Sequence, residues 1–424
     1  MKRREAARAY ARAGVVTAAA AAAWLRWPRH QMRAGSPRIL LVRPDHLGDV
    51  LLTTPAIAAL RAALPQARLI ALVGPWAAPA LARNPHLDAV HVTPFPGFTR
   101  EAAPALWAPY AQLLRQARRL ARWRVDAAIN FRPDFWWGAA LLALAGIPVR
   151  VGYNLAPGAT ALTHRVSLPP APEHAARLAL RLAATASRAM GAPGFAPAPW
   201  QPEAHPVIFP LDDADRAWAR EWLERAGLPG AARPLLVHPG AGAPVKRWTA
   251  TAWARVIERL AAELDAPVVV AGAAAEAGVA AAITQAVRAP AYVLSFAEDA
   301  PLTRYAALLA SARLVLGVDS GPLHLAAAVG TPTVRLFGPT DPAVFGPWGP
   351  AGRHAVVRSA ALPCMPCGRL DYPDAELPAH PCVRLIHPNL VVNAARTLLG
   401  QEDAAESSDT RESGAISATG SGAL

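Results

Sequence analysis

The sequence of residues 313–328, RLVLGVDSGPLHLAAA, combines an apolar run, a turn of small residues and the start of an alanine-rich helix. A continuous apolar run of this length is typical of a strand buried on both faces, as in a parallel sheet. Pro322 suits the first turn of the helix, because its missing N–H would have no partner there. The free amides of such a helix start bind phosphate groups. The stretch therefore predicts an α/β fold with a phosphate-binding turn.

Four residues of this turn are candidates for contacts with a phosphate-containing ligand: Asp319, Ser320, Gly321 and His324. Asp319 would either bind a hydroxyl group of the ligand or hold the loop in shape. His324 would either reach a phosphate or be an ordinary core histidine. The sequence leaves both pairs of alternatives open.

Similar strand-like runs alternate with helical segments along most of the chain. The alternation predicts two Rossmann-like, doubly wound domains that face a central cleft, each with a mostly parallel sheet covered by helices. Ligands of such sheets bind at the carboxyl ends of the strands. The predicted strands are 38–43, 68–73, 90–92, 126–130 and 149–152 in the first domain, and 234–238, 267–272, 292–296, 313–319 and 333–337 in the second.

A stretch rich in Pro and Ala, with little periodicity, separates the two series of strands. It predicts a linker, and a chain of 424 residues is long enough for two domains of ordinary size. Helices are expected at about 51–63 and 388–399. The predicted segments are a basic and apolar extension (1–36), an N-terminal domain (37–195), a linker (196–210), a C-terminal domain (211–400) and a disordered polar tail (401–424).

The composition indicates a folded, basic, intracellular protein. Hydrophobic residues make up 53% of the chain and charged residues 17%, which excludes a disordered protein. The net charge of +13 suits anionic ligands, a membrane surface or nucleic acid, but no nucleic-acid-binding motif is present. The three cysteines all lie between residues 364 and 382 and form no even-numbered disulfide framework, so we expect a cytoplasmic protein.

Two basic segments are candidates for contact with a membrane. In the first, Lys and Arg residues flank the apolar stretch 14–25, which is too short to span a bilayer. It is an interfacial helix on anionic lipid, the result of a start codon assigned too far upstream, or an extension without structure. The second is a face of one predicted helix that would meet phosphates or membrane, or would simply be solvated. Its residues are Arg115, Arg118, Arg119 and Arg122.

The first predicted strand leads directly into RPDHLGD (43–49) and then into an apolar helix. Asp49 lies where this parallel strand gives way to the helix, so its carboxylate would face a bound ligand. There it would accept a proton from an incoming hydroxyl group as a general base. The alternative is that Asp49 only caps the helix. Gly48 allows a ligand to approach closely, and Arg43 belongs to the same turn.

The second domain opens with HPGAGAPVKRW (238–248), a turn of small residues followed by two cations. Gly240, Gly242 and Lys246 suit a diphosphate, whereas the lack of a third glycine argues against the dinucleotide fingerprint of hydride-transferring enzymes. All but two of the 43 basic residues are arginine. Lys246 therefore either marks a position that needs a compact ammonium group or is a chance survivor.

Two further turns follow predicted strands and end at the same edge of the second sheet. Thr340 and Asp341 would contact the ligand, although such turns are also common without any function. Glu276 follows the strand 267–272, where an acidic residue binds ribose hydroxyls in Rossmann-like domains.

The cysteine spacing raises the question of a metal. Cys364, Cys367 and Cys382, with His380 or His387 as a fourth ligand, have a spacing that would suit zinc. The separation of Cys382 from the first two is loose, so we expect no metal.

Taken in their order, these motifs resemble glycosyltransferase family 9, the heptosyltransferases. The resemblance covers roughly residues 37–399 and rests on LGDVLLTTPAI, HPGAGAPVKRW, DSGPLHLAAAVGTPTVRLFGPTDP and CMPC. It implies a GT-B fold with the acceptor on the N-terminal domain and the donor on the C-terminal domain. It also implies inverting transfer from ADP-heptose, with no required cofactor, to a lipid-linked or core oligosaccharide of lipopolysaccharide. The implied location is the cytoplasm, with peripheral contact to the inner face of the cytoplasmic membrane.

The resemblance also assigns roles by position. Asp49 matches the base of the family, Lys246 its phosphate-binding lysine, and Asp319, Gly321 and His324 its donor loop. Two other functions stay open: a member of the same fold that binds a nucleotide sugar or glycan without turnover, and a nucleic-acid-binding protein, which the net charge alone suggests. The complete set of polar site residues argues against the first and the lack of a motif against the second.

Overall fold

The computed structural model describes residues 2–26, 36–98, 107–192, 195, 198–288, 292–297, 299–359 and 362–400. The chain divides into two compact units, Met1–Pro210 and Leu211–Leu424. The predicted disordered tail and two residues of the predicted linker, 196–197, lie outside the described residues. In the part of the chain that the structure describes, no helix is both long enough and apolar enough to cross a membrane.

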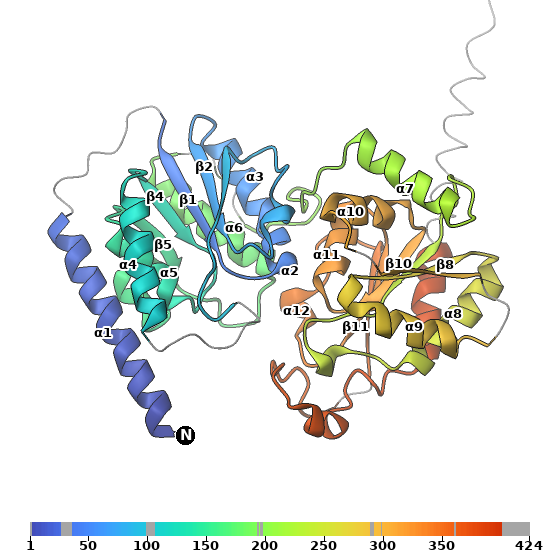
Figure 1. The fold of residues 1–424 in the computed structure, drawn as a ribbon. Helices are drawn as coiled ribbons and strands as arrows, with labels where there is room; N and C mark the ends of the chain where they lie inside the picture. Colours follow the sequence, from blue (N-terminus) through green and yellow to red (C-terminus); the bar gives the residue numbers. More distant parts are fainter. Residues whose placement is uncertain are drawn as a thin grey trace, which may run out of the picture. The chain divides into compact units, whose positions relative to one another are not determined.

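The N-terminal unit contains a six-stranded parallel sheet with the order β3-β2-β1-β4-β5-β6 (Figure 1). This is the strand order of a Rossmann fold. The order in which successive strands are added across the sheet reverses between β1 and β4, while the strands stay parallel. The strands are β1 (Arg38–Arg43), β2 (Arg68–Val73), β3 (Ala89–Val92), β4 (Ala127–Asn130), β5 (Val149–Tyr153) and β6 (His164–Val166).

Helices cover both faces of this sheet. On one face, α4 and α5 share a core with Leu40 and Val42 of β1, and on the other face α6 packs on β4 and β5 and contacts α3. The helices are α1 (Lys2–Arg26), α2 (Leu47–Leu51), α3 (Thr54–Ala63), α4 (Ala108–Ala121), α5 (Trp136–Leu144) and α6 (Ala175–Ala189), with short 3₁₀ helices η2 (Ala78–Ala80) and η3 (Gly158–Ala161).

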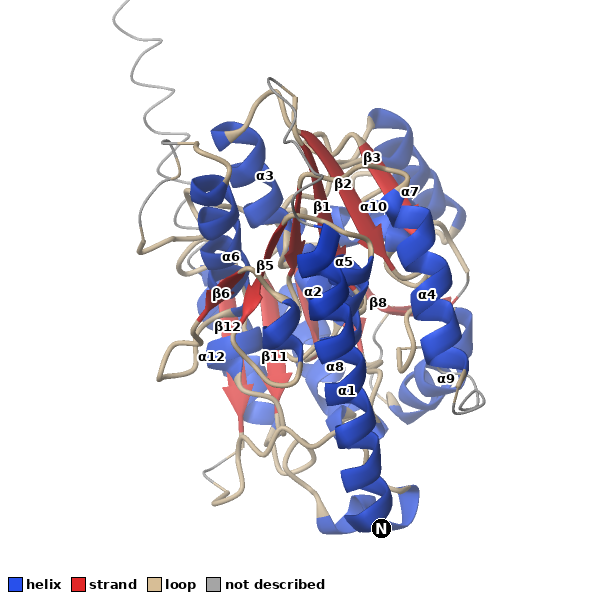
Figure 2. Cartoon of the chain, turned by 90° about the vertical axis from the view of Figure 1, so that its left-hand side faces the viewer, coloured by secondary structure: helices blue, strands red, loops and turns tan. Residues whose placement is uncertain are grey.

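The N-terminal extension begins with a helix, α1, that packs against α5 (Figure 2). Val16, Ala19 and Ala23 of this helix are buried and belong to the same hydrophobic core as α4 and α5. The Arg12 guanidinium also lies 5.8 Å from the ring centroid of Trp136 on α5. The described part of the extension is therefore an integral element of the N-terminal unit.

The C-terminal unit repeats the same architecture. Its six parallel strands have the order β12-β11-β10-β7-β8-β9, so the reversal lies between β7 and β10. The strands are β7 (Leu235–His238), β8 (Val268–Gly272), β9 (Val293–Ala297), β10 (Leu314–Val318), β11 (Thr333–Phe337) and β12 (His354–Arg358). The helices are α7 (Asp213–Arg225), α8 (Ala250–Leu264), α9 (Ala277–Ala286), α10 (Leu302–Ser311), α11 (Gly321–Ala328), α12 (Pro342–Phe345) and a last helix over residues 388–400, with 3₁₀ helices η4 (Pro244–Lys246), η5 (Ala274–Glu276) and η6 (Asp374–Ala379).

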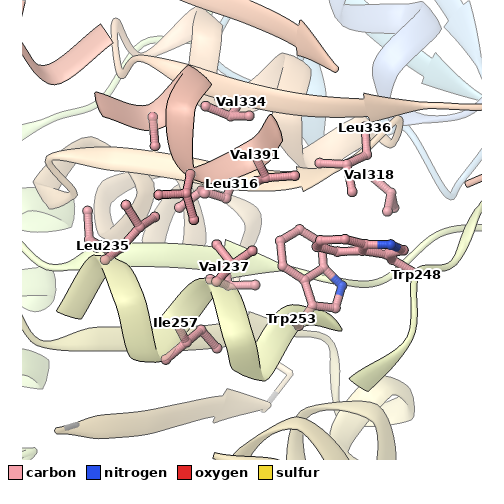
Figure 3. Close-up of a cluster of buried hydrophobic side chains, with 14 of the residues drawn as sticks. Leu235, Val237, Trp248, Trp253, Ile257, Leu316, Val318, Val334, Leu336 and Val391 are labelled. Atoms are coloured by element: carbon pink, nitrogen blue, oxygen red, sulfur yellow. The ribbon is translucent and has the colours of Figure 1, made fainter. Parts of the chain in front are cut away.

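The core of the C-terminal unit lies between the sheet and the helices α8, α9 and 388–400 (Figure 3). Trp248 and Trp253 pack edge to face, with ring centroids 4.9 Å apart, at the end of the core beside Val318 and Val237. Trp248 follows the turn after β7 in the sequence, so this aromatic pair anchors the turn that carries Lys246.

The prediction of two doubly wound α/β domains is confirmed, but the sequence missed two strands and misplaced one helix start. Strands β6 and β12 were not predicted, because they are partly exposed edge strands with His and Arg among few apolar residues. The helix expected at 51–63 is two helices, α2 and α3. Because α2 begins at Leu47, Asp49 lies in its first turn, and the N-cap is His46, whose side chain makes no capping bond. The alternative that Asp49 is the helix cap is wrong.

Candidate active site

The two reversals of strand order, and the turns that follow the strands beside them, hold most of the predicted site residues, whereas Glu276 follows β8 and Thr340 and Asp341 follow β11. In the N-terminal unit these turns follow β1 and β4, and in the C-terminal unit they follow β7 and β10. Crevices at such points of open α/β sheets are where ligands bind, because the helix N-termini on both sides point toward them.

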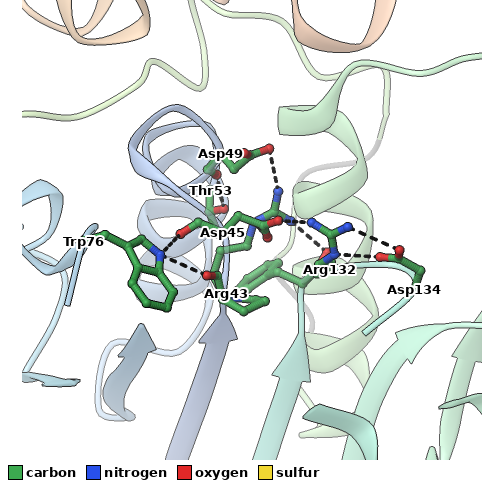
Figure 4. A network of polar contacts seen from close by, with 9 residues as sticks. Arg43, Asp45, Asp49, Thr53, Trp76, Arg132 and Asp134 are labelled. Atoms are coloured by element: carbon green, nitrogen blue, oxygen red, sulfur yellow. Dashed lines mark hydrogen bonds and ion pairs between the residues drawn. The ribbon is translucent and has the colours of Figure 1, made fainter. Parts of the chain in front are cut away.

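In the N-terminal unit, Arg43 connects the end of β1 to Asp49 (Figure 4). Its Nη2 donates a hydrogen bond of 3.1 Å to Oδ1 of Asp49, and its Nη1 donates one of 3.0 Å to the carbonyl of Phe131. The backbone carbonyl of Asp49 accepts a hydrogen bond of 2.9 Å from the hydroxyl of Thr53. Arg43 at the end of β1 thus fixes the carboxylate of Asp49, and Thr53 at the break between α2 and α3 holds its backbone. Gly48, in the first turn of α2, precedes it.

Four residues that the sequence did not single out complete this network. Asp45 forms an ion pair with Nε of Arg43 at 2.8 Å and a second one with Arg132, which follows β4. Arg132 also pairs with Asp134 at 2.7 Å. The indole Nε1 of Trp76 donates to the carbonyl of Asp45 at 2.9 Å and holds the turn in place. The tripeptide Arg-Pro-Asp follows both β1 and β4 in the sequence, and this repeat was the available signal.

The surroundings of Asp49 favour a stronger base than an ordinary aspartate. Burial raises its pKa, Arg43 and Arg132 lower it, and Asp45 raises it, so that its pKa is raised overall. The side chain still keeps 31% of its surface exposed. Within the described residues no hydrogen bond reaches its Oδ2. A carboxylate that is both reachable and more basic than usual is suited to general-base chemistry.

In the C-terminal unit, three turns meet at Asp319. Lys246, on η4 after β7, donates a hydrogen bond of 2.8 Å to its Oδ2, and Thr340, after β11, donates one of 2.7 Å to the same oxygen. Lys246 and Asp319 expose only 13% and 8% of their side chains. The backbone N–H of Asp319 donates to the carbonyl of Leu336 at 3.0 Å. Asp319 therefore holds the loop together, which is one of the two roles its sequence position suggested.

The N-terminus of α11 lies directly after Asp319. Ser320 is the N-cap residue, with an extended backbone, and its side chain makes no capping hydrogen bond. Its hydroxyl oxygen is buried without a hydrogen-bond partner in the part of the chain that the structure describes. Gly321 and Pro322 begin the helix. This uncapped helix start, beside the Lys246 ammonium, is a site for an anionic group.

His324 points into the domain and contacts a buried arginine. Its Nδ1 lies 3.2 Å from Nη1 of Arg335 on β11, and because a guanidinium only donates, Nδ1 accepts and the ring proton is on Nε2. Arg335 also donates to the carbonyl of Leu323 at 2.8 Å. Burial lowers the pKa of Arg335 to about 9. The sequence signal for Arg335 was an arginine inside the apolar strand TVRLF.

Glu276 and Gly240 are neighbours in the structure. A Cβ atom on Gly240 would lie 1.8 Å from Oε1 of Glu276, so a larger residue at this position would displace the Glu276 side chain. Oε2 of Glu276 accepts a hydrogen bond of 3.1 Å from the amide of Ala273. Gly242 is exposed in the same turn as Gly240. The structure thus brings together the turns after β7 and β8.

The remaining candidates are Asp341 and the three cysteines. Asp341 caps α12 by accepting a hydrogen bond of 2.9 Å from the amide of Ala343, so turn chemistry accounts for it. Cys364 and Cys367 are exposed, whereas Cys382 is buried. Burial raises the pKa of the Cys382 thiol. The described residues contain no group of three or more His, Cys, Asp or Glu side chains that could hold a metal ion.

The N-terminal unit is Rossmann-like and has, after its first strand, a carboxylate whose pKa is raised. The C-terminal unit is also Rossmann-like and has an anion site after its first and fourth strands. This is the architecture of a GT-B glycosyltransferase. Residues 113–375 match glycosyltransferase family 9 (heptosyltransferase). Lipopolysaccharide heptosyltransferase 3 of Escherichia coli is 26% identical over 309 residues, which cover 71% of this chain and 83% of the relative. The chain therefore belongs to glycosyltransferase family 9, and it is a glycosyltransferase.

Solved structures agree with this fold. ADP-heptose lipopolysaccharide heptosyltransferase II of E. coli has a TM-score of 0.65 and 21% identity, over 86% of this chain and 99% of that one. The E. coli heptosyltransferase WaaC with ADP has a TM-score of 0.61 and 21% identity, over 85% of this chain and 99% of that one. The predicted family and the predicted two-domain fold are confirmed.

Proposed function

We propose that this enzyme transfers a heptosyl group, with inversion, from ADP-heptose to an acceptor sugar of the lipopolysaccharide core or a related cell-surface glycan. The family description and the names of the relatives support the heptosyl group and the core acceptor. The ADP complex of the E. coli enzyme supports the nucleotide. The observation that carries the proposal is the cluster of Lys246, Asp319 and Thr340 beside the uncapped start of α11.

On the donor side, the α11 amides and the Lys246 ammonium bind the diphosphate and stabilise the charge that develops on it. Asp319 keeps Lys246 and Thr340 in place for this task. Glu276 is available to the ribose hydroxyls, and the helix-embedded His324 supports the loop through Arg335.

On the acceptor side, Asp49 is the general base. Its Oδ2 accepts the proton of the acceptor hydroxyl while the hydroxyl oxygen forms a bond to the anomeric carbon of the heptose. The bond between that carbon and the diphosphate oxygen breaks, and ADP leaves with the electron pair. Arg43 holds Oδ1 of Asp49 during the transfer.

The identity of the donor is tested by nucleotide binding to the full chain. In calorimetric titrations we expect ADP to bind at least about tenfold more tightly than UDP, because a purine site loses packing contacts when a pyrimidine replaces adenine. With ADP-heptose and ADP-glucose as donors, slow hydrolysis to ADP is expected to favour the heptose. Tighter binding of UDP, or no binding of either nucleotide, would remove ADP-heptose as the donor.

We further propose that the enzyme works in the cytoplasm, at the inner surface of the membrane. The support comes from α4 and its flanks: residues 107–124 contain five arginines and no acidic residue. Arg115, Arg118 and Arg122 are exposed, and none pairs with an acid among the described residues. Trp107 and Leu114 expose 69% and 48% of their surface beside these charges. Arginines next to exposed apolar side chains suit anionic lipid headgroups.

Vesicle sedimentation measures this association. The chain is expected to pellet with vesicles that contain phosphatidylglycerol and not with pure phosphatidylcholine, and salt is expected to release it. Replacing Arg115, Arg118 and Arg122 by Ser is expected to weaken binding about 100-fold, at about 1 kcal/mol for each charge. The control variant replaces Arg216, Arg220 and Arg225, three exposed arginines of α7, in the same way. An equal loss in both variants would contradict a specific surface on α4.

A further inference from the structure

Asp45 is a buried carboxylate between two guanidinium groups. Only 4% of its surface is exposed. Nε of Arg43 lies 2.8 Å from its Oδ2, and Arg132 pairs with its Oδ1. The indole of Trp76 holds its backbone carbonyl. A carboxylate enclosed in this way cannot receive a proton from a bound sugar, so Asp45 is not itself a candidate base.

Arg43 is shared between Asp45 and Asp49. It presents Nε to Asp45 and Nη2 to Asp49, while Nη1 is fixed by the carbonyl of Phe131 at 3.0 Å. The second cation, Arg132, is held by Asp45 and Asp134, and no hydrogen bond joins it to Asp49 in the part of the chain that the structure describes. How strongly the two cations act on Asp49 therefore depends on the carboxylate that lies between them.

We propose that Asp45 is a positioning residue for the base: it holds Arg43 and Arg132 and neutralises them, so that Asp49 accepts one fixed hydrogen bond at Oδ1 and keeps Oδ2 for the acceptor hydroxyl. This inference rests on the proposed role of Asp49. Without the Asp45 charge, Asp49 becomes the nearest carboxylate for Arg43, and a guanidinium pairs readily with both oxygens of one carboxylate. Such a pair would occupy Oδ2 and weaken the base.

The first test is the pH dependence of kcat for Asp45→Asn, with ADP-heptose and deacylated core oligosaccharide. The charged groups that face Asp49 are Arg43 from β1, Asp45 from the following turn and Arg132 from the turn after β4. Removing the negative charge of Asp45 leaves the two cations to act on Asp49, so its pKa is expected to fall. The acidic limb of the profile should move down by about one pH unit, and the plateau kcat should fall about tenfold because the base is weaker.

The matched control is Asp88→Asn, which removes a carboxylate that pairs with Arg61 at 2.5 Å and keeps 41% of its side chain exposed, before β3 and outside the network around Asp49. We expect this variant to keep the wild-type profile, and KM for the acceptor and Kd for ADP to change less than about twofold in both variants. An Asp45→Asn profile with an unmoved acidic limb, or one shared by Asp88→Asn, would overturn the proposal.

A second measurement needs no turnover. The carboxyl carbon of Asp49 can be titrated by NMR in the free chain and assigned with Asp49→Asn. Its pKa is expected to be lower in Asp45→Asn and in the smaller Asp45→Ser than in the wild-type protein. An unchanged Asp49 pKa in the folded variants sinks the inference about Asp45. Full activity of Asp49→Asn sinks the proposed base instead, so the two failures are distinguishable.

Discussion

Replacing Asp49 by Asn is expected to lower kcat by about 10³, within the range that loss of a general base produces. The amide cannot take the proton of the acceptor hydroxyl, while its size leaves α2 and the turn after β1 intact. Because the donor contacts proposed above all come from the C-terminal unit, Kd for ADP should change less than about twofold. Steady-state rates with ADP-heptose and deacylated core oligosaccharide, together with calorimetry for ADP, measure both quantities.

Two comparisons make this result specific. Asp88→Asn, which alters an exposed carboxylate that pairs with Arg61 outside this network, is expected to keep kcat within about twofold of wild type. The melting temperature of Asp49→Asn should be at or slightly above that of the wild type, because burial disfavours its charged form. Retention of more than about a tenth of the wild-type kcat by Asp49→Asn would assign the base to another residue.

The fold was largely predictable because it depends on local patterns. Runs such as RILLVR and RLVLGV are apolar at consecutive positions, as in strands of a parallel sheet that is covered by helices on both faces. These runs identified β1 and β10, which are buried in the structure. The two strands that the sequence missed are partly exposed edge strands, where burial no longer demands a continuous apolar run. The break between α2 and α3 does have a local signal, because Pro55 lies in the first turn of α3, where proline is favoured.

The candidate site was predictable only where one turn carries the chemistry. The loop around Asp319 combines a strand end, small residues and a helix start in consecutive positions, so its anion site follows from local rules. The network around Asp49 depends on Arg132, which pairs with Asp45 from 87 residues away. The repeated Arg-Pro-Asp tripeptide marks both turns, but it does not show that the two turns contact each other. The same holds for Arg335, whose contact with His324 depends on the packing of β11 beside α11.

Replacing Lys246 by Met is expected to raise Kd for ADP about 30-fold, or about 2 kcal/mol, the scale of a charge-assisted contact to phosphate. The Met side chain keeps the length and the packing of the Lys stem. The loss has two physical parts: the ammonium no longer binds the diphosphate, and the Asp319 carboxylate, 8% exposed, is left without its counter-ion beside the anion. Calorimetric titration of the variant with ADP measures the sum of both.

The double variant Lys246→Met with Asp319→Asn separates these parts. If the uncompensated carboxylate repels the diphosphate, the double variant binds ADP more tightly than Lys246→Met alone. The difference in the free energy of ADP binding between these two variants then measures the repulsion. The neighbouring cation Arg247, which is exposed and contacts the carbonyl of Ala241 at 3.5 Å, provides the control: Arg247→Met should keep Kd within about threefold. Equal losses at both positions would mean that general positive charge, and not the cluster around Asp319, holds the donor. An unchanged Kd in Lys246→Met would remove Lys246 from the site.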